Sequence, residues 1–337
     1  MRVAVYHSNS DIRLEERPVP SLNEGEILVR MMACGICGTD VMEWYRRHKG
    51  PRVLGHEMAG EVAETSGVTE FKRGDRVFVS HHVPCLECRY CLSEKSSACE
   101  SLHSGNYDPG GFAEFIRIPQ ANVKYGTLRL PQNVSFEEAT MIEPLACAIA
   151  GQKRLGLRDG QTMLVIGCGI SGLTHIRLAK LKNIRVIATD LNEYRLKKAL
   201  EFGADHAINA GAYNPEKLKE LNQGNLAEAV VVCAGATRAV ADAIDSVDRR
   251  GTILFFAIPP QDICLPPVRF WRDEISVTFS YGAAGEDLKE ALDLIASGQV
   301  KAAKMISHRL PLKDITAGFR LVSEAGKSLK VVITPDA

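Results

Sequence analysis

The chain has 337 residues, which is too long for one compact core and about right for two domains. Its 41 Lys and Arg residues balance 41 Asp and Glu residues, which argues against a nucleic-acid binder because such proteins usually carry a basic excess or stripe. No apolar run approaches about 18 residues and the N-terminus lacks a basic-then-apolar leader, so we expect a soluble, cytoplasmic protein with no membrane partner.

The predicted elements change in character near residue 143. Before it, short apolar strands are expected between glycine-containing turns and helical periodicity is scarce, which favours a β-rich domain of barrel type. After it, apolar strands alternate with helical segments, a pattern typical of a parallel sheet flanked by helices. The early strands are expected at 26–33, 58–63 and 75–80, the later ones at 163–167, 185–190, 206–209, 229–235, 251–257 and 276–281, and the clearest helices at 170–182, 194–202 and 286–297.

Ten cysteines are the unusual feature of the composition, because clustered cysteines in a reducing compartment favour metal or redox chemistry over disulfides. Four of them, Cys85, Cys88, Cys91 and Cys99, have spacings that let one loop wrap around a tetrahedral zinc ion. Such a site leaves no open position, so the predicted zinc is structural and replaces the core that so short a lobe cannot build. An iron–sulfur cluster and four unconnected surface cysteines are the alternatives.

A second constellation lies upstream, where Cys37 is followed by Thr39 and Asp40 and, later, by His56 and Glu57. A thiolate, an imidazole and a carboxylate together would form an incomplete zinc shell with room for a substrate oxygen. A cysteine and a histidine about twenty residues apart are weak evidence alone, because a buried histidine is commoner. The coincidence with the four-cysteine lobe and with the motif described next favours a metal site.

The dinucleotide signature is the run Gly167-Cys-Gly169-Ile170-Ser171-Gly172, which follows an apolar strand and opens a helix. Its glycines would permit a tight turn and close approach of a pyrophosphate to the helix N-terminus. Asp190 ends the next strand and would hold the adenosine ribose and repel a 2′-phosphate, which favours NAD over NADP. Arg195 would either soften that preference or lie along the outer face of its helix.

Several motifs follow one another along the chain in a characteristic order. In these motifs the chain resembles the zinc-dependent medium-chain dehydrogenases, in the branch that contains sorbitol and threonine dehydrogenases. The resemblance implies an α/β fold with a β-rich part, in which a GroES-like catalytic domain (1–146 with 284–337, carrying both zinc sites) is interrupted by a Rossmann domain with a doubly wound parallel sheet (147–283). It also implies an active site in the cleft between them. The motifs are GICGTD at 35–40, GHE at 55–57, the four-cysteine lobe, GGFAEF at 110–115, IEPLA at 142–146 and GCGISG at 167–172.

The resemblance also implies roles for individual residues of the metal site. Cys37 and His56 would be catalytic zinc ligands, and Glu57 or Glu143 would complete the shell. Asp40 would accept a hydrogen bond from His56, and the Thr39 hydroxyl would carry away the substrate proton. Cys34 is then a packing residue, and Lys330 either neutralises Glu57 or is solvated.

The implied activity is the reversible, NAD-dependent oxidation of a secondary alcohol (a polyol, sugar acid or related hydroxy compound) to its ketone. Two zinc ions per chain are expected, and so is a homodimer or homotetramer in which the strand at 276–281 pairs with its twin. A catalytically inactive zinc- and nucleotide-binding regulator and a zinc-free quinone-type reductase are the alternatives. The resemblance also assigns cofactor contacts to Cys233, Ala234, Gly235 and Ala257, which follow two strands of the nucleotide domain.

Three departures from the resembled branch bear on the substrate. Met42 stands where these enzymes carry a histidine and cannot relay a proton, Glu43 replaces a pocket tyrosine, and Ser280 replaces a substrate-binding arginine. Specificity for sorbitol or threonine is therefore not expected. The basic run at 46–49 would either bind an anionic substrate or form a solvated loop.

Overall fold

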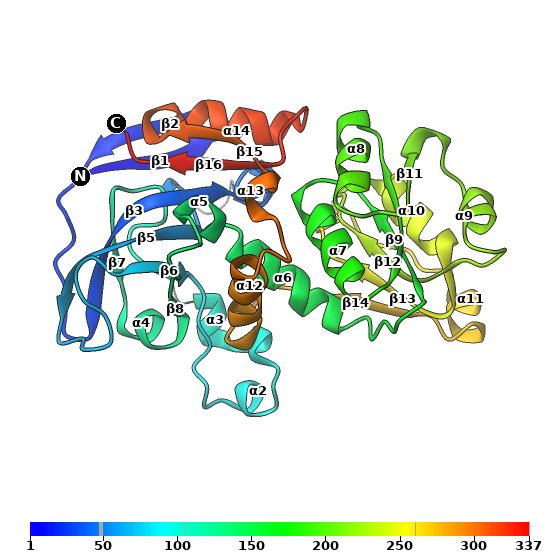
Figure 1. The fold of residues 1–337 in the computed structure, drawn as a ribbon, viewed down its shortest axis with the longest axis horizontal. Coiled ribbons are helices and arrows are strands. Elements are labelled where there is room, and N and C mark those ends of the chain that lie inside the picture. The colour runs from blue at the N-terminus through cyan, green and yellow to red at the C-terminus, as the bar shows by residue number, and fades with distance from the viewer. Residues whose placement is uncertain (47–49, 105, 260, 337) are drawn as a thin grey trace. The chain divides into compact units, whose positions relative to one another are not determined.

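The computed structural model describes residues 1–46, 50–104, 106–259 and 261–336 and divides the chain into two compact units (Figure 1). Unit 1 contains Met1–Ala146 and resumes at Gly282, and unit 2 contains Cys147–Tyr281. The chain leaves unit 1 within helix α6 (Ile142–Lys153). It returns at residue 282, two residues before the expected residue 284.

Unit 1 is built mainly from antiparallel strands. Among its described residues, one sheet has the order β15-β16-β3-β5-β6-β8 with β7 beside β3, and a smaller sheet has the order β2-β1-β4. The long strand β3 is almost entirely buried because neighbours pair along both of its edges. The strands are β1 (Arg2–Ser8), β2 (Asp11–Glu16), β3 (Glu26–Ile36), β4 (Arg52–Val53), β5 (Glu57–Ser66), β6 (Arg76–Ser80), β7 (Phe115–Ile118), β8 (Thr127–Arg129), β15 (Ile306–Pro311) and β16 (Lys330–Thr334).

The helices of unit 1 are mostly short. Helix α5 begins with a capping box, in which the Ser135 hydroxyl and the Glu138 carboxylate each accept a backbone N–H of the other residue. The helices are α1 (Glu43–Arg46), α2 (Arg89–Leu92), α3 (Glu100–Ser104), α4 (Gln120–Gly126), α5 (Phe136–Ala139), α12 (Glu286–Ala296), α13 (Ala302–Met305) and α14 (Ile315–Glu324), with single turns η2 (Ser96–Ala98) and η4 (Leu312–Asp314).

Unit 2 is a parallel sheet flanked by helices, as the alternating pattern predicts (Figure 1). Its strand order is β11-β10-β9-β12-β13-β14, and its central strand β9 is buried throughout, as expected for a sheet covered on both faces. The elements are β9 (Thr162–Ile166), α7 (Ile170–Leu181), β10 (Arg185–Asp190), α8 (Glu193–Glu201), β11 (His206–Asn209), η3 (Ala210–Ala212), α9 (Pro215–Leu221), β12 (Ala227–Val232), α10 (Thr237–Ser246), β13 (Val247–Phe255), α11 (Pro267–Arg272) and β14 (Ser276–Phe279).

The order of these strands places the dinucleotide motif. The chain proceeds outward from β9 to β11 and then crosses back to β12 on the other side of β9, so β9 and β12 mark the point where the winding direction changes. Ligands of such sheets bind at this point, beyond the carboxyl ends of the strands. The glycine run follows β9 directly and therefore lies there.

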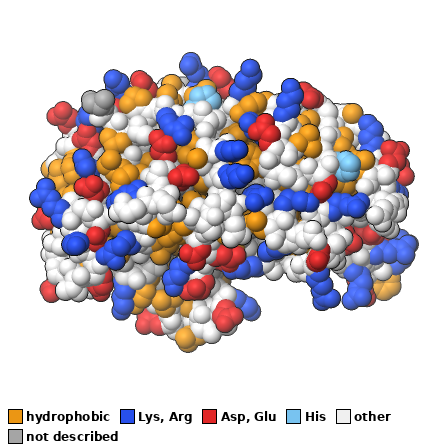
Figure 2. Space-filling model, viewed as in Figure 1, with side chains coloured by type: hydrophobic (Ala, Val, Ile, Leu, Met, Phe, Trp, Pro, Cys, Tyr) orange, Lys and Arg blue, Asp and Glu red, His pale blue; other side chains and the backbone are white. Residues whose placement is uncertain are grey.

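The surface agrees with the balanced composition. On the face drawn in Figure 2, Lys and Arg side chains are interspersed with Asp and Glu. Within the part of the chain that the structure describes, no helix is both long enough and apolar enough to span a bilayer.

Candidate active site and metal centres

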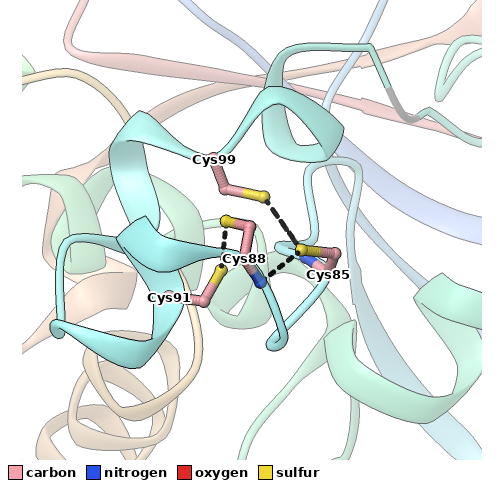
Figure 3. Close-up of side chains that lie close together, drawn as sticks. All are labelled: Cys85, Cys88, Cys91 and Cys99. Carbon is pink, nitrogen blue, oxygen red and sulfur yellow. Dashed lines mark hydrogen bonds between the residues drawn. The ribbon is translucent and has the colours of Figure 1, made fainter.

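Four cysteine sulfurs converge in the lobe that follows β6, which we call the closed cluster (Figure 3). Cys88 caps helix α2, Cys91 lies within it, and Cys99 directly precedes α3. The four sulfur atoms lie within 4.8 Å of one another, with Cys88 Sγ 3.6 Å from Cys91 Sγ and Cys99 Sγ 3.6 Å from Cys85 Sγ. This donor set fits tetrahedral zinc and leaves no ligand position for water or substrate.

Backbone N–H groups prepare the closed cluster for a metal. The N–H of Cys85 donates to Cys99 Sγ at 3.4 Å, and that of Cys88 donates to Cys85 Sγ at 3.4 Å. Burial alone would raise the pKa of the Cys99 thiol, but hydrogen bonds, chiefly from backbone N–H groups, lower it to about 6. The thiolate is the form that binds zinc, so these hydrogen bonds favour the ligand form of Cys99, whereas burial and a hydrogen bond with Cys88 raise the pKa of Cys91 to about 12.

The second group, which we call the open cluster, consists of Cys37, His56 and Glu57. Cys37 follows β3, while His56 directly precedes β5 and Glu57 is its first residue. These strands pair antiparallel with Gly35 opposite Glu57, which brings the two ends together. A Cβ atom on Gly35 would clash with the Glu57 carboxylate, so glycine there leaves room for this carboxylate in its present position. The ligand atoms of the three residues lie within 4.8 Å of one another, which fits an incomplete zinc shell.

Asp40 supports the open cluster from behind. It is fully buried, with Oδ1 3.5 Å from His56 Nδ1, and Oδ2 accepts the Cys37 N–H at 3.1 Å. Burial alone would raise the pKa of this carboxyl, but His56 and Arg46 hold it below its ordinary value. Burial alone would lower the pKa of His56, but Asp40 and Cys37 raise it well above its ordinary value. Zinc would therefore compete with a proton for His56.

Glu57 is held by a buried lysine. Lys330 opens β16, which pairs with β3, and its Nζ lies 2.7 Å from Oε1 and 2.5 Å from Oε2 of Glu57. Both side chains are buried, so the alternative of a solvated lysine is wrong. Burial alone would lower the pKa of Lys330, but the charges of Glu57 and Cys37 raise it.

Arg46 also contacts the metal loop and does not form the solvated loop considered for the basic run. Its side chain, at the end of α1, is only 14% exposed. Nε donates to the Thr39 carbonyl oxygen at 2.9 Å, and Nη2 donates to Thr39 Oγ1 at 3.3 Å and to Asp40 Oδ1 at 3.2 Å. The other members of that run, Arg47, His48 and Lys49, lie outside the described residues.

Glu143 lies in the first turn of α6 and is not one of the three residues whose ligand atoms converge. Its charge nevertheless contributes to the raised pKa of Lys330, after larger effects of burial and of Glu57. It also contributes to the raised pKa of Tyr107, for which burial is the main cause. Glu143 is thus near enough to the open cluster to influence its charged groups.

Sequence reasoning missed His81 as a neighbour of the open cluster. Its ring centroid lies 4.8 Å from that of His56 and 3.6 Å from that of His82. Burial, followed by the charges of His56 and its neighbours, holds the pKa of His81 well below its ordinary value, so the ring is neutral. The register explains its place, because Ser80 pairs with Glu57 and His81 comes next. A sequence alone does not reveal that register.

In unit 2, the predicted glycine loop turns from β9 into α7. Gly167 has φ +97°, a conformation that favours glycine, and a Cβ on Gly172 would clash with the Gly167 carbonyl oxygen. Gly169 caps α7 without any side-chain hydrogen bond to the first turn, which begins with Ile170 and Ser171. The positive end of the helix dipole is thus left to a ligand, and the loop fits a pyrophosphate.

Asp190 lies against this loop, because its Oδ2 accepts the Cys168 N–H at 2.7 Å and its Oδ1 accepts the Asn192 N–H at 2.8 Å. Arg195 departs from the outer-face alternative. Its Nη1 lies 3.6 Å from the point where a Cβ on Gly169 would stand, and its buried Nε has no hydrogen-bond partner among the described residues. The guanidinium therefore lies over the glycine loop.

The remaining predicted cofactor residues gather at the same strand ends. Cys233 and Ala234 follow β12, and a Cβ on Gly167 would meet Ala234 at 3.0 Å. The Ala257 N–H donates to the Val232 carbonyl oxygen at 2.9 Å, which places Ala257 beside the end of β12. A Cβ on Gly235 would lie 3.3 Å from the Ile258 carbonyl oxygen. The set thus occupies one edge of the sheet, where dinucleotides bind in such folds.

Comparisons with known proteins agree with this geometry. Residues 23–127 match the alcohol dehydrogenase GroES-like domain, and residues 171–297 match the zinc-binding dehydrogenase model. Sorbitol dehydrogenase of Ovis aries is 32% identical over 98% of this chain and 96% of its own, and L-threonine 3-dehydrogenase of Bacillus velezensis is 32% identical over 99% of each. Alcohol dehydrogenase TADH from Thermus sp. ATN1 superposes with a TM-score of 0.88 at 28% identity, covering both chains fully. The chain therefore belongs to the zinc-binding, medium-chain alcohol dehydrogenase family.

Proposed function

We propose that this protein is a zinc-dependent NAD(H) oxidoreductase that interconverts a secondary alcohol and its ketone. The open cluster supports this most directly, because the ligand atoms of Cys37, His56 and Glu57 converge and no fourth cysteine, histidine or carboxylate joins them within the described part of the chain. Zinc held by Cys37 and His56 would act as a Lewis acid that polarises the substrate oxygen, while the nicotinamide exchanges hydride with the substrate carbon.

The surrounding residues would keep this site charged and rigid. Asp40 orients His56, Lys330 balances Glu57, and either Glu57 or Glu143 would complete the shell. The Thr39 hydroxyl donates to Cys37 Sγ at 3.3 Å, and it would therefore lie beside a substrate oxygen bound at the open cluster. Met42 cannot replace a histidine as a relay.

The glycine loop and Asp190 support NAD as the preferred cofactor. The Asp190 carboxylate is fixed by two backbone N–H groups, so a 2′-phosphate would meet a negative charge that cannot move away. Arg195 lies over Gly169 and would contact the cofactor as well, and its positive charge moderates this preference. We expect kcat/KM to favour NAD over NADP about tenfold, the discrimination that corresponds to roughly 1.4 kcal/mol.

For the substrate, the departures at Met42 and Glu43 favour a secondary alcohol other than sorbitol or threonine. The Glu43 carboxylate accepts the Asn9 N–H at 3.0 Å. Arg46 is paired with Asp40, so it does not supply an unpaired charge for an anionic substrate. On the evidence of Arg46, the described residue of the basic run, we favour a neutral polyol or diol over a sugar acid.

The test combines metal analysis with a substrate screen. The purified enzyme is assayed with NAD and with NADP against sorbitol, L-threonine, (2R,3R)-butanediol, gluconate and 2-propanol, and zinc is measured per chain. We expect two zinc ions, turnover of a neutral diol or polyol, and none in Cys37→Ala. Turnover of no alcohol, with NADH still bound, would favour the regulatory alternative, and fewer than about two zinc ions would favour the zinc-free reductase.

The edge of the unit 2 sheet supports a homo-oligomer. Strand β14 is last in the order, and Phe279 on it is 57% exposed, while Trp271 in the preceding helix α11 is 82% exposed. An apolar sheet edge is protected by pairing with a second copy. Light scattering should give a dimer or tetramer for the wild type and a smaller species for Phe279→Glu, and a monomeric wild type would contradict this assembly.

A further inference from the structure

Arg46, the last residue of helix α1, is held against the metal loop by several contacts. Nε and Nη2 together donate three hydrogen bonds, two to Thr39 and one to Asp40. The guanidinium also lies over the Tyr45 ring, 5.3 Å from its centroid. Because α1 begins two residues after Val41, the chain turns back sharply and brings residue 46 against residue 39.

These contacts determine what the Thr39 hydroxyl can do. Arginine carries only donors and does not lose its proton in proteins, so Thr39 Oγ1 must accept from Arg46. The hydroxyl hydrogen must then point away from Arg46. It points toward the open cluster, where Thr39 Oγ1 donates to Cys37 Sγ at 3.3 Å.

We propose that Arg46 is a positioning residue that fixes the Thr39 hydroxyl as a hydrogen-bond donor toward the open cluster. This rests on the proposed function, in which that hydroxyl meets the substrate oxygen. Met42 stands where the resembled enzymes carry a histidine that can exchange protons, and the Arg46 guanidinium that contacts Thr39 cannot exchange them either. Once the alcohol proton has left to water, the Thr39 hydroxyl hydrogen would turn from Cys37 Sγ to the substrate oxygen and stabilise it, while neither Met42 nor Arg46 would carry the proton away.

The test is a double-mutant cycle with Arg46→Lys and Thr39→Val in the zinc-loaded enzyme. A lysine keeps the positive charge, but its single ammonium group cannot donate from two separate nitrogens as Nε and Nη2 of Arg46 do. If Arg46 acts through the hydroxyl, Arg46→Lys should lower kcat by roughly 10- to 100-fold with KM changed less than about threefold, the size of effect known for residues that orient catalytic groups. In the Thr39→Val background the same change should have little further effect. Arg13→Lys, in an exposed pair with Asp11, is the matched control.

A readout independent of turnover is the absorption of the cobalt-substituted protein. The hydrogen bond from Thr39 to the Cys37 sulfur should affect the thiolate-to-cobalt charge-transfer band. Arg46→Lys and Thr39→Val should each shift this band, and the double variant should shift it no further. The closed cluster also takes up cobalt but is the same in all four proteins, so difference spectra report on the open cluster.

The results distinguish a failure of the proposed function from a failure of the proposal about Arg46. If the wild type oxidises no alcohol, the proposed function fails, and Arg46 is judged by the cobalt spectra alone. Equal effects of Arg46→Lys in both Thr39 backgrounds would overturn the proposal. So would a loss of zinc that parallels the loss of kcat, because Arg46 would then act only by holding Asp40 and the metal. Non-additive losses with full metal content would support it.

Discussion

The closed and open clusters lie in the same unit, yet their ligands are supported in different ways. In the closed cluster the cysteines support one another, since backbone N–H groups of Cys85 and Cys88 donate to neighbouring sulfurs and the lobe exposes Leu92 at 74%. In the open cluster the supports are buried charges, Asp40 in the turn after β3 and Lys330 at the start of β16. We infer that metal holds the first site together, whereas the fold holds the second site ready for metal.

The largest expected effect separates the two clusters by function. Cys37→Ala should abolish turnover and reduce zinc to one ion per chain, while NADH fluorescence titration shows unchanged binding, because the glycine loop lies in the other unit. The matched control is Cys34→Ala. Cys34 is buried three residues away, outside the set of converging ligands, so this variant should keep both zinc ions and turnover. Retained turnover in Cys37→Ala would remove the distinction between the clusters.

For the closed cluster we expect a loss of local structure, with turnover largely kept. Cys91→Ala should reduce zinc to one ion per chain and make the segment at 85–99 sensitive to limited proteolysis, because metal binding of about 10–16 kcal/mol in zinc-finger peptides is their folding energy. Turnover per loaded chain should fall far less than in Cys37→Ala. Cys264→Ala changes an exposed cysteine outside both clusters and serves as control. A protease-resistant lobe without its metal would show that the lobe has a core of its own.

These differences also decide what could be predicted from sequence. The closed cluster was visible because its ligands lie within fifteen residues, and the glycine loop because it follows a strand directly. The fold class was predicted for the same reason, since strand and helix periodicities are local signals. The supports of the open cluster are not local. Lys330 lies 273 residues from Glu57, and their pairing depends on a strand register that the sequence does not display.

Arg46 shows a second limit. Its position next to other basic residues suggested a solvated loop, because a charge run is usually exposed. The turn between Asp40 and α1 instead brings it back onto Thr39. Local composition predicted the charge, but only the chain direction after the metal loop decides where that charge lies.

The buried ion pair tests whether the fold supports the open cluster. Lys330→Met should lower the free energy of unfolding by about 3–5 kcal/mol, because it leaves the buried Glu57 carboxylate without its cation. Urea denaturation of the metal-free protein measures this loss, because zinc bound by Glu57 would otherwise supply a second cation. Adding Glu57→Gln should restore part of it, since both charges are then gone, whereas Arg13→Ala at an exposed pair should change little. If Lys330→Met is as stable as Arg13→Ala, buried charge does not hold this site.

The smallest expected effect concerns a buried titratable group that, unlike those of the open cluster, has no charged partner to offset its burial. His175 on α7 is fully buried, neither ring nitrogen has a hydrogen-bond partner among the described residues, and burial lowers its pKa to about 3. An unfolded histidine has a pKa near 6.5, so below that pH the unfolded state binds a proton that the folded state does not. Stability should therefore fall from pH 7 to pH 5 by about 2 kcal/mol through this residue, and it should continue to fall toward pH 3.

His175→Leu removes the group while keeping an apolar contact for Phe256, whose ring centroid is 4.6 Å away. It should reduce the difference in Tm between pH 7 and pH 5, whereas His7→Asn at an exposed position should not. An unchanged difference in His175→Leu would mean that His175 finds a partner in solution. In that case His175, like His56, would have a partner that offsets the free-energy cost of burying its ring.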